Sequence, residues 1–298
     1  MADDSATVWP RGVISALVTP MGADETLAMG PLPRLIERQL HAGVAGFVVG
    51  GGTGEFGSLS ITERKRLAEE VVAIVDRRVP VIVQTGALAT RDALELSSHA
   101  GDIGAAGQLT VSPFGESISW EERLAFYSTL DAKSSIPIML YNTPPAGLLT
   151  FAQIVKLAEL PRVTAVKDSS GQSDLLGDLI AWSADDFGVY VGSDTLLYDA
   201  VVAGAWGAVF GTPNIVPGEL AAIAHDVRQN GSTDENLAAW RRLRPFLRAM
   251  EQSPNYMSAC KAMCARVGMD VGPVRAPYLP SSDAEIEELV ALLEQAVA

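Results

Sequence analysis

The chain has 298 residues, of which 48% are hydrophobic and 19% are charged, and this composition excludes an intrinsically disordered protein. No apolar run approaches the roughly 20 residues that a membrane-spanning helix requires, so the sequence predicts no membrane span. The formal net charge of −14 and the pI of about 4.6 argue against binding to nucleic acid or an anionic membrane, because contacts with phosphate groups need basic patches.

The beginning of the chain and its cysteines indicate the compartment. Residues 1–12 are polar and acidic, unlike a secretory signal. The only two cysteines, Cys260 and Cys264, are four residues apart in a predicted helix, which favours buried reduced thiols over a disulfide framework or a zinc site. We therefore expect a cytoplasmic protein.

Short apolar segments alternate with longer amphipathic segments along the first 230 residues, which is the pattern of βα units. The apolar segments lack regular polar alternation, and this indicates strands that are buried on both faces, as in a parallel sheet. Predicted helices such as 61–78 and 119–133 each open after a Ser or Thr that can cap the first turn. The predicted strands are 12–20, 46–51, 79–86, 107–113, 136–144, 163–169, 188–194 and 207–214.

Eight such units in roughly 220 residues match a (β/α)8 TIM barrel, although an open doubly wound sheet shows a similar alternation. No strand-to-helix turn carries GxGxxG, which weakens the dinucleotide-binding form of the open sheet. After about Asn230 the strand pattern ends, and the remainder predicts three helices connected by GPVRAPYLP (272–280). The predicted α/β fold is a (β/α)8 barrel catalytic domain over 1–230 with a C-terminal three-helix extension over 231–298.

In a barrel of this kind the chemistry lies at the C-terminal ends of the strands. The second predicted strand runs into GGGTGE (50–55). Its glycines would let backbone N–H groups approach a small carboxylate, and the hydroxyl of Thr53 adds a donor. Gly-rich turns also occur for packing reasons, so these residues alone leave both interpretations open.

Lys167 ends an apolar run, 163–166, that is typical of a buried strand. A lysine there must extend to water, pair with an acid, or react as a neutral amine. Asp168 is a poor partner because adjacent strand residues point to opposite faces, which leaves Glu55 as the acid for an ion pair. Desolvation favours the neutral amine, which attacks carbonyl groups to form a Schiff base. The residues favour a nucleophile without excluding the ion pair.

Other titratable residues give weaker signals. Tyr141 ends the fifth predicted strand, where its phenol could relay a proton, but a tyrosine at a strand end is more often a packed residue with a hydrogen-bonded hydroxyl. His41, His99 and His225 fall in predicted helices away from the strand ends. A Ser-His-Asp relay is therefore not expected.

Three segments in chain order, GGTGE (51–55), YNTPP (141–145) and VKDSSG (166–171), resemble motifs of the dihydrodipicolinate synthase and N-acetylneuraminate lyase superfamily of Schiff-base-forming class I aldolases. The resemblance covers nearly the whole chain, including GPVRAP (272–277). It implies that Lys167 forms an imine with the ketone of pyruvate or another 2-oxo acid and that Tyr141 shuttles protons. It also implies no metal and no cofactor, because the imine is itself the electron sink.

The resemblance assigns further roles around the expected imine. Thr53 and the amides of Gly52 to Gly54 would hold the substrate carboxylate. The backbone around Val209 would form the wall behind the keto acid, with Gly192 close beside it. Asp194 aligns with a position that binds sugar hydroxyls in sialic acid lyases, so we expect it to contact a hydroxylated tail. Relatives are commonly tetramers, so a homotetramer or homodimer is expected.

Three positions depart from the usual dihydrodipicolinate synthase pattern. Gly52 replaces the first of two adjacent threonines, and Phe114 stands where a second tyrosine normally follows the fourth strand. Ala146 stands where an arginine normally grips the carboxylate of the aldehyde substrate. These departures argue against the synthase reaction of lysine biosynthesis.

GGTGEF and GPVRAP are similar to segments of relatives that act on 2-keto-3-deoxy sugar acids, hydroxy-oxoglutarate and 5-dehydro-4-deoxyglucarate. The expected activity is a lyase that cleaves or condenses such a 2-oxo acid, with pyruvate as one component. The alternatives are a dehydratase of a 2-keto-3-deoxy acid (5-dehydro-4-deoxyglucarate type), dihydrodipicolinate synthase itself, or a catalytically silent keto-acid-binding barrel. Retention of both Tyr141 and Lys167 argues against the silent barrel.

Overall fold

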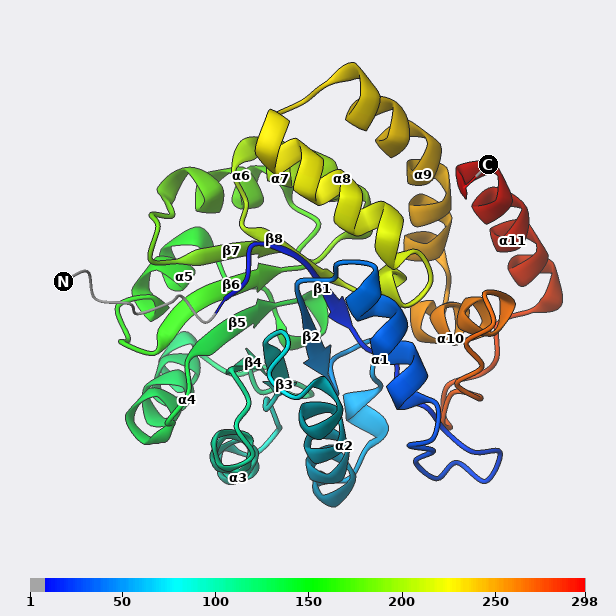
Figure 1. The fold of residues 1–298 in the computed structure, drawn as a ribbon. Coiled ribbons are helices and arrows are strands. Elements are labelled where there is room, and N and C mark those ends of the chain that lie inside the picture. Colours follow the sequence, from blue (N-terminus) through cyan, green and yellow to red (C-terminus); the bar gives the residue numbers. More distant parts are fainter. Residues whose placement is uncertain (1–8, 298) are drawn as a thin grey trace.

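The computed structural model describes residues 9–297, and within them eight parallel strands pair in chain order to form a closed barrel (Figure 1). The (β/α)8 TIM barrel is therefore confirmed. The prediction that the chain has no secretory signal rests on residues 1–12, and most of these lie outside the described residues. The strands are β1 (Gly12–Ala16), β2 (Gly46–Val49), β3 (Val81–Gln84), β4 (Gly107–Val111), β5 (Ile138–Asn142), β6 (Val163–Asp168), β7 (Gly188–Val191) and β8 (Gly207–Phe210).

The barrel closes where β8 pairs with β1, and this seam requires glycine. Gly12 of β1 lies opposite Gly207 of β8 in the register of the two strands. A Cβ atom at Gly207 would overlap the carbonyl oxygen of Gly12, and Gly12 itself has a φ of +141°. Only a residue without a side chain permits this approach at both positions.

Helices alternate with the strands around the outside of the barrel (Figure 1). The predicted caps are confirmed, because α2 and α4 each begin with a capping box, at Ser60 and Ser119. Asp76 and Arg77 adopt φ values of 47° and 59°, so α2 ends at Val75, three residues before the predicted end. The helices are α1 (Leu32–His41), α2 (Ile61–Val75), α3 (Thr90–Asp102), α4 (Trp120–Lys133), α5 (Phe151–Leu157), α6 (Ser173–Trp182), α7 (Leu197–Ala203) and α8 (Pro217–Asn230).

The observed strands are shorter than predicted because the chain turns immediately after them. β5 ends at Asn142, and Pro144 and Pro145, which lack a backbone N–H, lie in a single 3-10 turn, η2 (Pro144–Ala146). Similar turns, η1 (Phe56–Ser58), η3 (Asp194–Leu196) and η4 (Thr212–Asn214), follow β2, β7 and β8. They carry polar residues onto the rim of the barrel.

The interior of the barrel is filled by side chains and is not a channel. Trp9 and Trp206, next to the N-terminal ends of the strands, pack against the inner cluster. The indole Nε1 of Trp9 donates to Thr164 Oγ1 at 2.8 Å. The inner cluster consists of Ile14, Ala16, Val48, Ile82, Leu109, Met139, Ala165, Tyr190 and Val209. The opposite end, at the C-terminal ends of the strands, is left for a cavity.

Residues 231–297 form a helical extension of α9 (Asp234–Gln252), α10 (Tyr256–Arg266) and α11 (Asp283–Val297) at one side of the barrel (Figure 1). α9 contacts η3, and α10 contacts η4, so the extension reaches the rim. The predicted three-helix extension is confirmed, and the division into domains at residue 230 stays a prediction. Within residues 9–297, every helix is too short or too polar to cross a membrane.

Candidate active site

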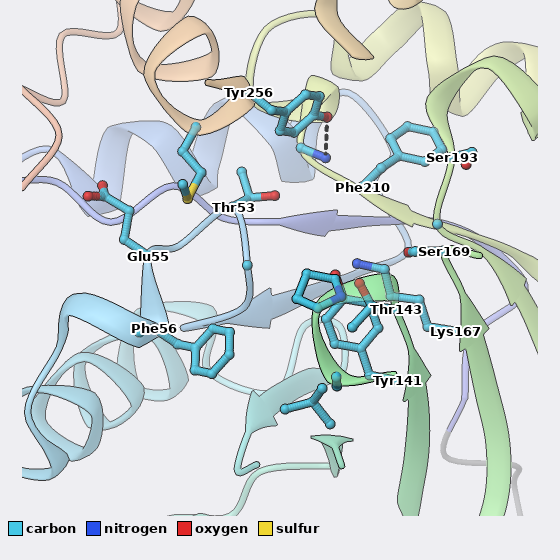
Figure 2. A pocket seen from close by; sticks show the side chains of 18 of the residues that line it. Thr53, Glu55, Phe56, Tyr141, Thr143, Lys167, Ser169, Ser193, Phe210 and Tyr256 are labelled. Atoms are coloured by element: carbon cyan, nitrogen blue, oxygen red, sulfur yellow. Dashed lines mark hydrogen bonds between the residues drawn. The ribbon is translucent and has the colours of Figure 1, made fainter. Parts of the chain in front are cut away.

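A cavity of about 730 Å³ opens at the C-terminal ends of the strands (Figure 2). It is lined by rim residues of the barrel and by residues of the extension. The barrel contributes the polar side chains of Thr53, Glu55, Tyr141, Thr143, Lys167, Ser169, Ser193 and Asp194. The cavity therefore lies where the strand-end argument places the chemistry.

Lys167 and Tyr141 come together in this cavity because they are register partners on adjacent strands. The Nζ atom of Lys167 lies 4.4 Å from the centroid of the Tyr141 ring, and both side chains point into the same space in Figure 2. Lys167 is only 5% exposed. A nearly enclosed amine beside a phenol is suited to carbonyl addition with proton transfer.

The ion-pair alternative for Lys167 is wrong. The carboxylate of Asp168 accepts hydrogen bonds from Asn142 Nδ2 at 2.7 Å and Ser170 Oγ at 2.8 Å. The carboxylate of Glu55 pairs with Lys261 Nζ at 2.6 Å. Both candidate acids are thus engaged by other groups, and the amine of Lys167 is directed to the cavity.

The phenol of Tyr141 is poised to move a proton. Burial raises its pKa, but the nearby charge of Lys167 and hydrogen bonds with the hydroxyls of Thr143 and Ser169 outweigh burial, so the pKa of Tyr141 is lowered from its ordinary value. These two hydroxyls were missed by sequence reasoning, although both lie in the YNTPP and VKDSSG segments. Both residues line the cavity together with Lys167.

Gly192 closely approaches the side chains of Lys167 and Ser169, and its expected place beside the keto acid stays a prediction. A Cβ atom there would overlap the hydroxyl of Ser169 and lie 3.0 Å from both Lys167 Cε and the Asp168 carbonyl oxygen. The backbone after β7 consequently packs directly against the lysine stem. The absence of a side chain at this position leaves the space that the stem of Lys167 occupies.

The residues of the GGGTGE loop are placed differently from one another. Gly52 and Thr53 line the cavity, and a Cβ atom at Gly52 would be 3.5 Å from the Tyr141 hydroxyl. Gly54 packs against the segment that follows β1 instead. Its carbonyl accepts from Thr19 Oγ1 at 2.6 Å, and a Cβ atom at Gly54 would be 2.9 Å from the Leu17 carbonyl.

Val209 lies deeper than the expected wall of the keto-acid site. Its side chain is fully buried in the inner cluster of the barrel. The next two residues along the chain, Phe210 and Gly211, line the cavity. The role of the backbone around Val209 as the wall behind the keto acid stays a prediction.

Asp194 lines the cavity, but its carboxylate already has protein partners. It is 2% exposed, and the hydroxyl of Tyr256 lies 3.0 Å from each of its oxygens. Thr212 Oγ1 donates to it as well. Burial first, and then the charge of Glu251, raises the pKa of Asp194 to about 7. Its contact with a substrate tail stays a prediction.

The C-terminal extension adds lining residues that the sequence did not predict: Glu251, Tyr256, Met257 and Tyr278. Tyr256 at the start of α10 enters the cavity in Figure 2, where its hydroxyl accepts from the backbone N–H of Gly211 at 2.9 Å. Strand-end reasoning considers only the barrel, so it could not find side chains that arrive through long-range packing.

The extension also holds the GGGTGE loop through a buried ion pair. The side chains of Glu55 and Lys261 are 0% and 2% exposed. The backbone N–H of Arg275 donates to Glu55 Oε2 at 2.9 Å, and Lys261 Nζ donates to the Pro273 carbonyl at 2.7 Å. Glu55 has a left-handed φ of 59°. The GPVRAP segment thus fixes the conformation of the loop that carries Thr53.

Residues 9–296 match the sequence model of the Dihydrodipicolinate synthetase family. The chain belongs to this family. It is 34% identical to 4-hydroxy-tetrahydrodipicolinate synthase of Salinibacter ruber over 280 residues, covering 92% of this chain and 91% of the relative. It is 32% identical to 4-hydroxy-tetrahydrodipicolinate synthase 2 of Halalkalibacterium halodurans over 285 residues, covering 95% and 97%.

Solved structures agree with the family assignment. The dihydrodipicolinate synthase of Acinetobacter baumannii complexed with pyruvate superposes with a TM-score of 0.91 and 27% identity, covering 97% of this chain and 99% of that one. YagE, a prophage protein of this family from E. coli K12 in complex with pyruvate, gives a TM-score of 0.91 and 26% identity, covering 96% and 98%.

Enzymes of the Dihydrodipicolinate synthetase family are lyases that form a covalent imine between a lysine and pyruvate without an external cofactor. The resemblance drawn from the three motifs is therefore confirmed, and the chain is an enzyme of this family. The silent-barrel alternative is not supported.

Two departures from the synthase pattern change the lining of the cavity. Ala146 and Phe114 both line it, where the usual pattern has an arginine and a tyrosine. The Phe114 ring packs edge-on against Phe56 with 5.5 Å between centroids. Among the lining residues that the structure describes, Lys167 is the only cation. A second substrate carboxylate would find no guanidinium there.

Proposed function

We propose that this enzyme is a pyruvate-dependent class I aldolase that cleaves or condenses a 2-oxo acid such as a 2-keto-3-deoxy sugar acid or 4-hydroxy-2-oxoglutarate. The observation that carries the proposal is the enclosed amine of Lys167 beside the ring of Tyr141, with Nζ 4.4 Å from the ring centroid. Membership of a pyruvate-utilising family supports the same chemistry.

In the proposed reaction the neutral amine of Lys167 attacks C2 of the 2-oxo acid, and the carbinolamine loses water to give an iminium ion. A base removes the proton of the C4 hydroxyl, the C3–C4 bond breaks, and its electron pair passes into the iminium to give an enamine and an aldehyde. Protonation of the enamine at C3 and hydrolysis of the imine release pyruvate and the free lysine.

Proton transfer in these steps is assigned to Tyr141, whose lowered pKa suits it to accept and return a proton. Thr143 and Ser169 would hold the phenol in position. Thr53 with the neighbouring backbone amides would bind the substrate carboxylate, because Gly52 and Thr53 line the cavity beside Tyr141.

A second candidate is the synthase reaction, because the curated relatives named above carry the name 4-hydroxy-tetrahydrodipicolinate synthase. Ala146 and Phe114 weigh against it, since they replace the arginine and tyrosine of the usual pattern. A dehydratase would use the same imine to expel water and would release no pyruvate.

The test is reductive trapping. The enzyme is incubated with pyruvate, reduced with borohydride, and weighed before and after, and peptide mapping locates the adduct. We expect a gain of one reduced pyruvate on Lys167 and none in a Lys167→Arg variant. An unmodified wild-type protein, or an adduct elsewhere, would refute the mechanism.

A panel of 2-oxo acids then identifies the reaction. Release of pyruvate from a hydroxylated 2-oxo acid supports the aldolase, and consumption without pyruvate release supports the dehydratase. Condensation of pyruvate with aspartate semialdehyde would support the synthase. The oligomeric state, homotetramer or homodimer, and the cytoplasmic location stay predictions.

A further inference from the structure

Glu251 is a carboxylate of the cavity that the proposed chemistry does not use. It lies at the penultimate position of α9 and lines the cavity. The hydroxyl of Thr195 in η3 donates to Glu251 Oε2 at 2.5 Å. One of the two carboxylate oxygens of Glu251 is therefore held in place by the rim turn η3, which contacts the extension.

The two acids on this side of the cavity, Asp194 and Glu251, differ in burial and in the hydrogen bonds that they accept from the protein. Asp194 is 2% exposed and accepts from Tyr256 and Thr212. Glu251 is half-buried, and its Oε2 atom accepts a hydrogen bond from the hydroxyl of Thr195. A carboxylate held by one oxygen within a cavity presents the other to a ligand, and a ligand hydroxyl is a suitable donor.

The charge of the lining points to the same class of ligand. The one cation among the described lining residues, Lys167, would be committed as the iminium at the 2-oxo end of the substrate. Three acids are among the same lining residues, and Glu55 is already paired with Lys261. Asp194 and Glu251 remain, and they are close enough for the charge of Glu251 to act on Asp194. A tail that ends in a carboxylate would meet two acids, whereas a neutral hydroxylated tail would meet hydrogen-bond acceptors.

We propose that Glu251 is a specificity-determining residue, whose carboxylate accepts a hydrogen bond from a hydroxyl of the substrate tail and disfavours a tail that carries a second carboxylate. The inference rests on the proposed aldolase function and deepens it. It selects the 2-keto-3-deoxy sugar acids with a neutral polyol tail over 4-hydroxy-2-oxoglutarate.

The test compares two acceptor aldehydes in the condensation direction with pyruvate: glyceraldehyde, which is neutral and hydroxylated, and glyoxylate, which carries a carboxylate. Wild-type enzyme, Glu251→Gln and Glu288→Gln are measured. Glu288 is an exposed glutamate of α11 and serves as the matched control. KM for the acceptor and kcat are determined separately for each variant.

We expect wild type to prefer glyceraldehyde. Glu251→Gln should raise KM for glyceraldehyde about ten- to a hundredfold, the range for losing a hydrogen bond to a charged group, and should lower KM for glyoxylate. Glu288→Gln should match wild type with both acceptors. Loss of the Glu251 charge should thus reverse or narrow the acceptor preference and leave kcat nearly unchanged.

Equal changes with both acceptors, or no change with either, would overturn the assignment of Glu251. A wild type that traps pyruvate but condenses neither aldehyde, or prefers glyoxylate, would overturn it as well while leaving the imine mechanism intact. Reductive trapping of pyruvate by Glu251→Gln should equal that of wild type. Failure of the proposed function itself would appear as no adduct in wild-type enzyme.

Discussion

Replacing Lys261 by methionine tests whether the extension holds the catalytic loop. The pair that Lys261 makes with Glu55 has an N–O distance of 2.6 Å, with side chains 2% and 0% exposed. Burial lowers the pKa of Lys261, and the hydrogen bond and charge of Glu55 oppose that shift. Methionine keeps most of the stem but leaves the Glu55 carboxylate buried without its cation, which costs about 3–5 kcal/mol.

The measurement is unfolding in urea and by heat, together with the rate of pyruvate adduct formation. Lys261→Met should lower the free energy of unfolding by that amount and the melting temperature by roughly 10 °C, and it should slow adduct formation because the loop carrying Thr53 loosens. The double variant Glu55→Gln/Lys261→Met should recover much of the loss, since it buries no net charge. Lys133→Met, at an exposed lysine, is the control.

If Lys261→Met lowers the free energy of unfolding by less than about 1 kcal/mol, the reasoning is refuted. Removing one member of a buried ion pair should cost more than a surface substitution does. A double variant less stable than Lys261→Met would refute it in another way, by showing that the neighbouring backbone contacts carry the stability and the charges do not.

Three further outcomes follow from the site. Tyr141→Phe should lower kcat by about 10²–10⁴-fold while a pyruvate adduct still forms on Lys167 during long incubation; an unchanged kcat would remove Tyr141 from the reaction. Gly192→Ala should slow adduct formation on the order of 100-fold, since its Cβ would lie 3.0 Å from Lys167 Cε, and a rate equal to wild type would contradict this. The pKa of Asp194 is raised to about 7, so the folded state holds a proton that the unfolded state releases near pH 4, and stability should fall as pH rises from about 4 to 7. Urea unfolding over this range should show the fall in wild type and not in Asp194→Asn, whereas parallel profiles would disprove the assignment.

The barrel and the pairing of Lys167 with Tyr141 follow from local sequence patterns. Apolar strands without alternation can be buried only between a filled interior and a layer of helices, and the side-chain period of two then places Lys167 inside and Asp168 outside. The C-terminal end of β5 was predicted two residues too far along the chain, because composition does not show where Pro144 and its neighbour turn the chain away.

The extension side of the cavity could not be predicted in this way. Glu251 and Tyr256 occupy helices whose periodicity describes packing against α8 and α11 but carries no information about the barrel mouth. Their positions depend on how α9 and α10 dock onto η3 and η4. The GPVRAP segment could be identified only by its resemblance to other sequences. Its physical role is to contact the Glu55–Lys261 pair through Arg275 and Pro273, and Glu55 lies about 200 positions away from them in the chain.

These two sources of information explain why the chemistry of this enzyme is easier to assign than its substrate. Strand register fixes Tyr141 opposite Lys167, so any chain that keeps the barrel and these two residues keeps the imine geometry. The side of the cavity that would hold the substrate tail consists of the turn η3, the end of α9 and the start of α10. Strand register does not constrain these elements, so their side chains can change one at a time. Under the proposed function, Lys167 and Tyr141 would set the imine chemistry, while Ala146 and Glu251 would set the charge that the second half of a substrate meets.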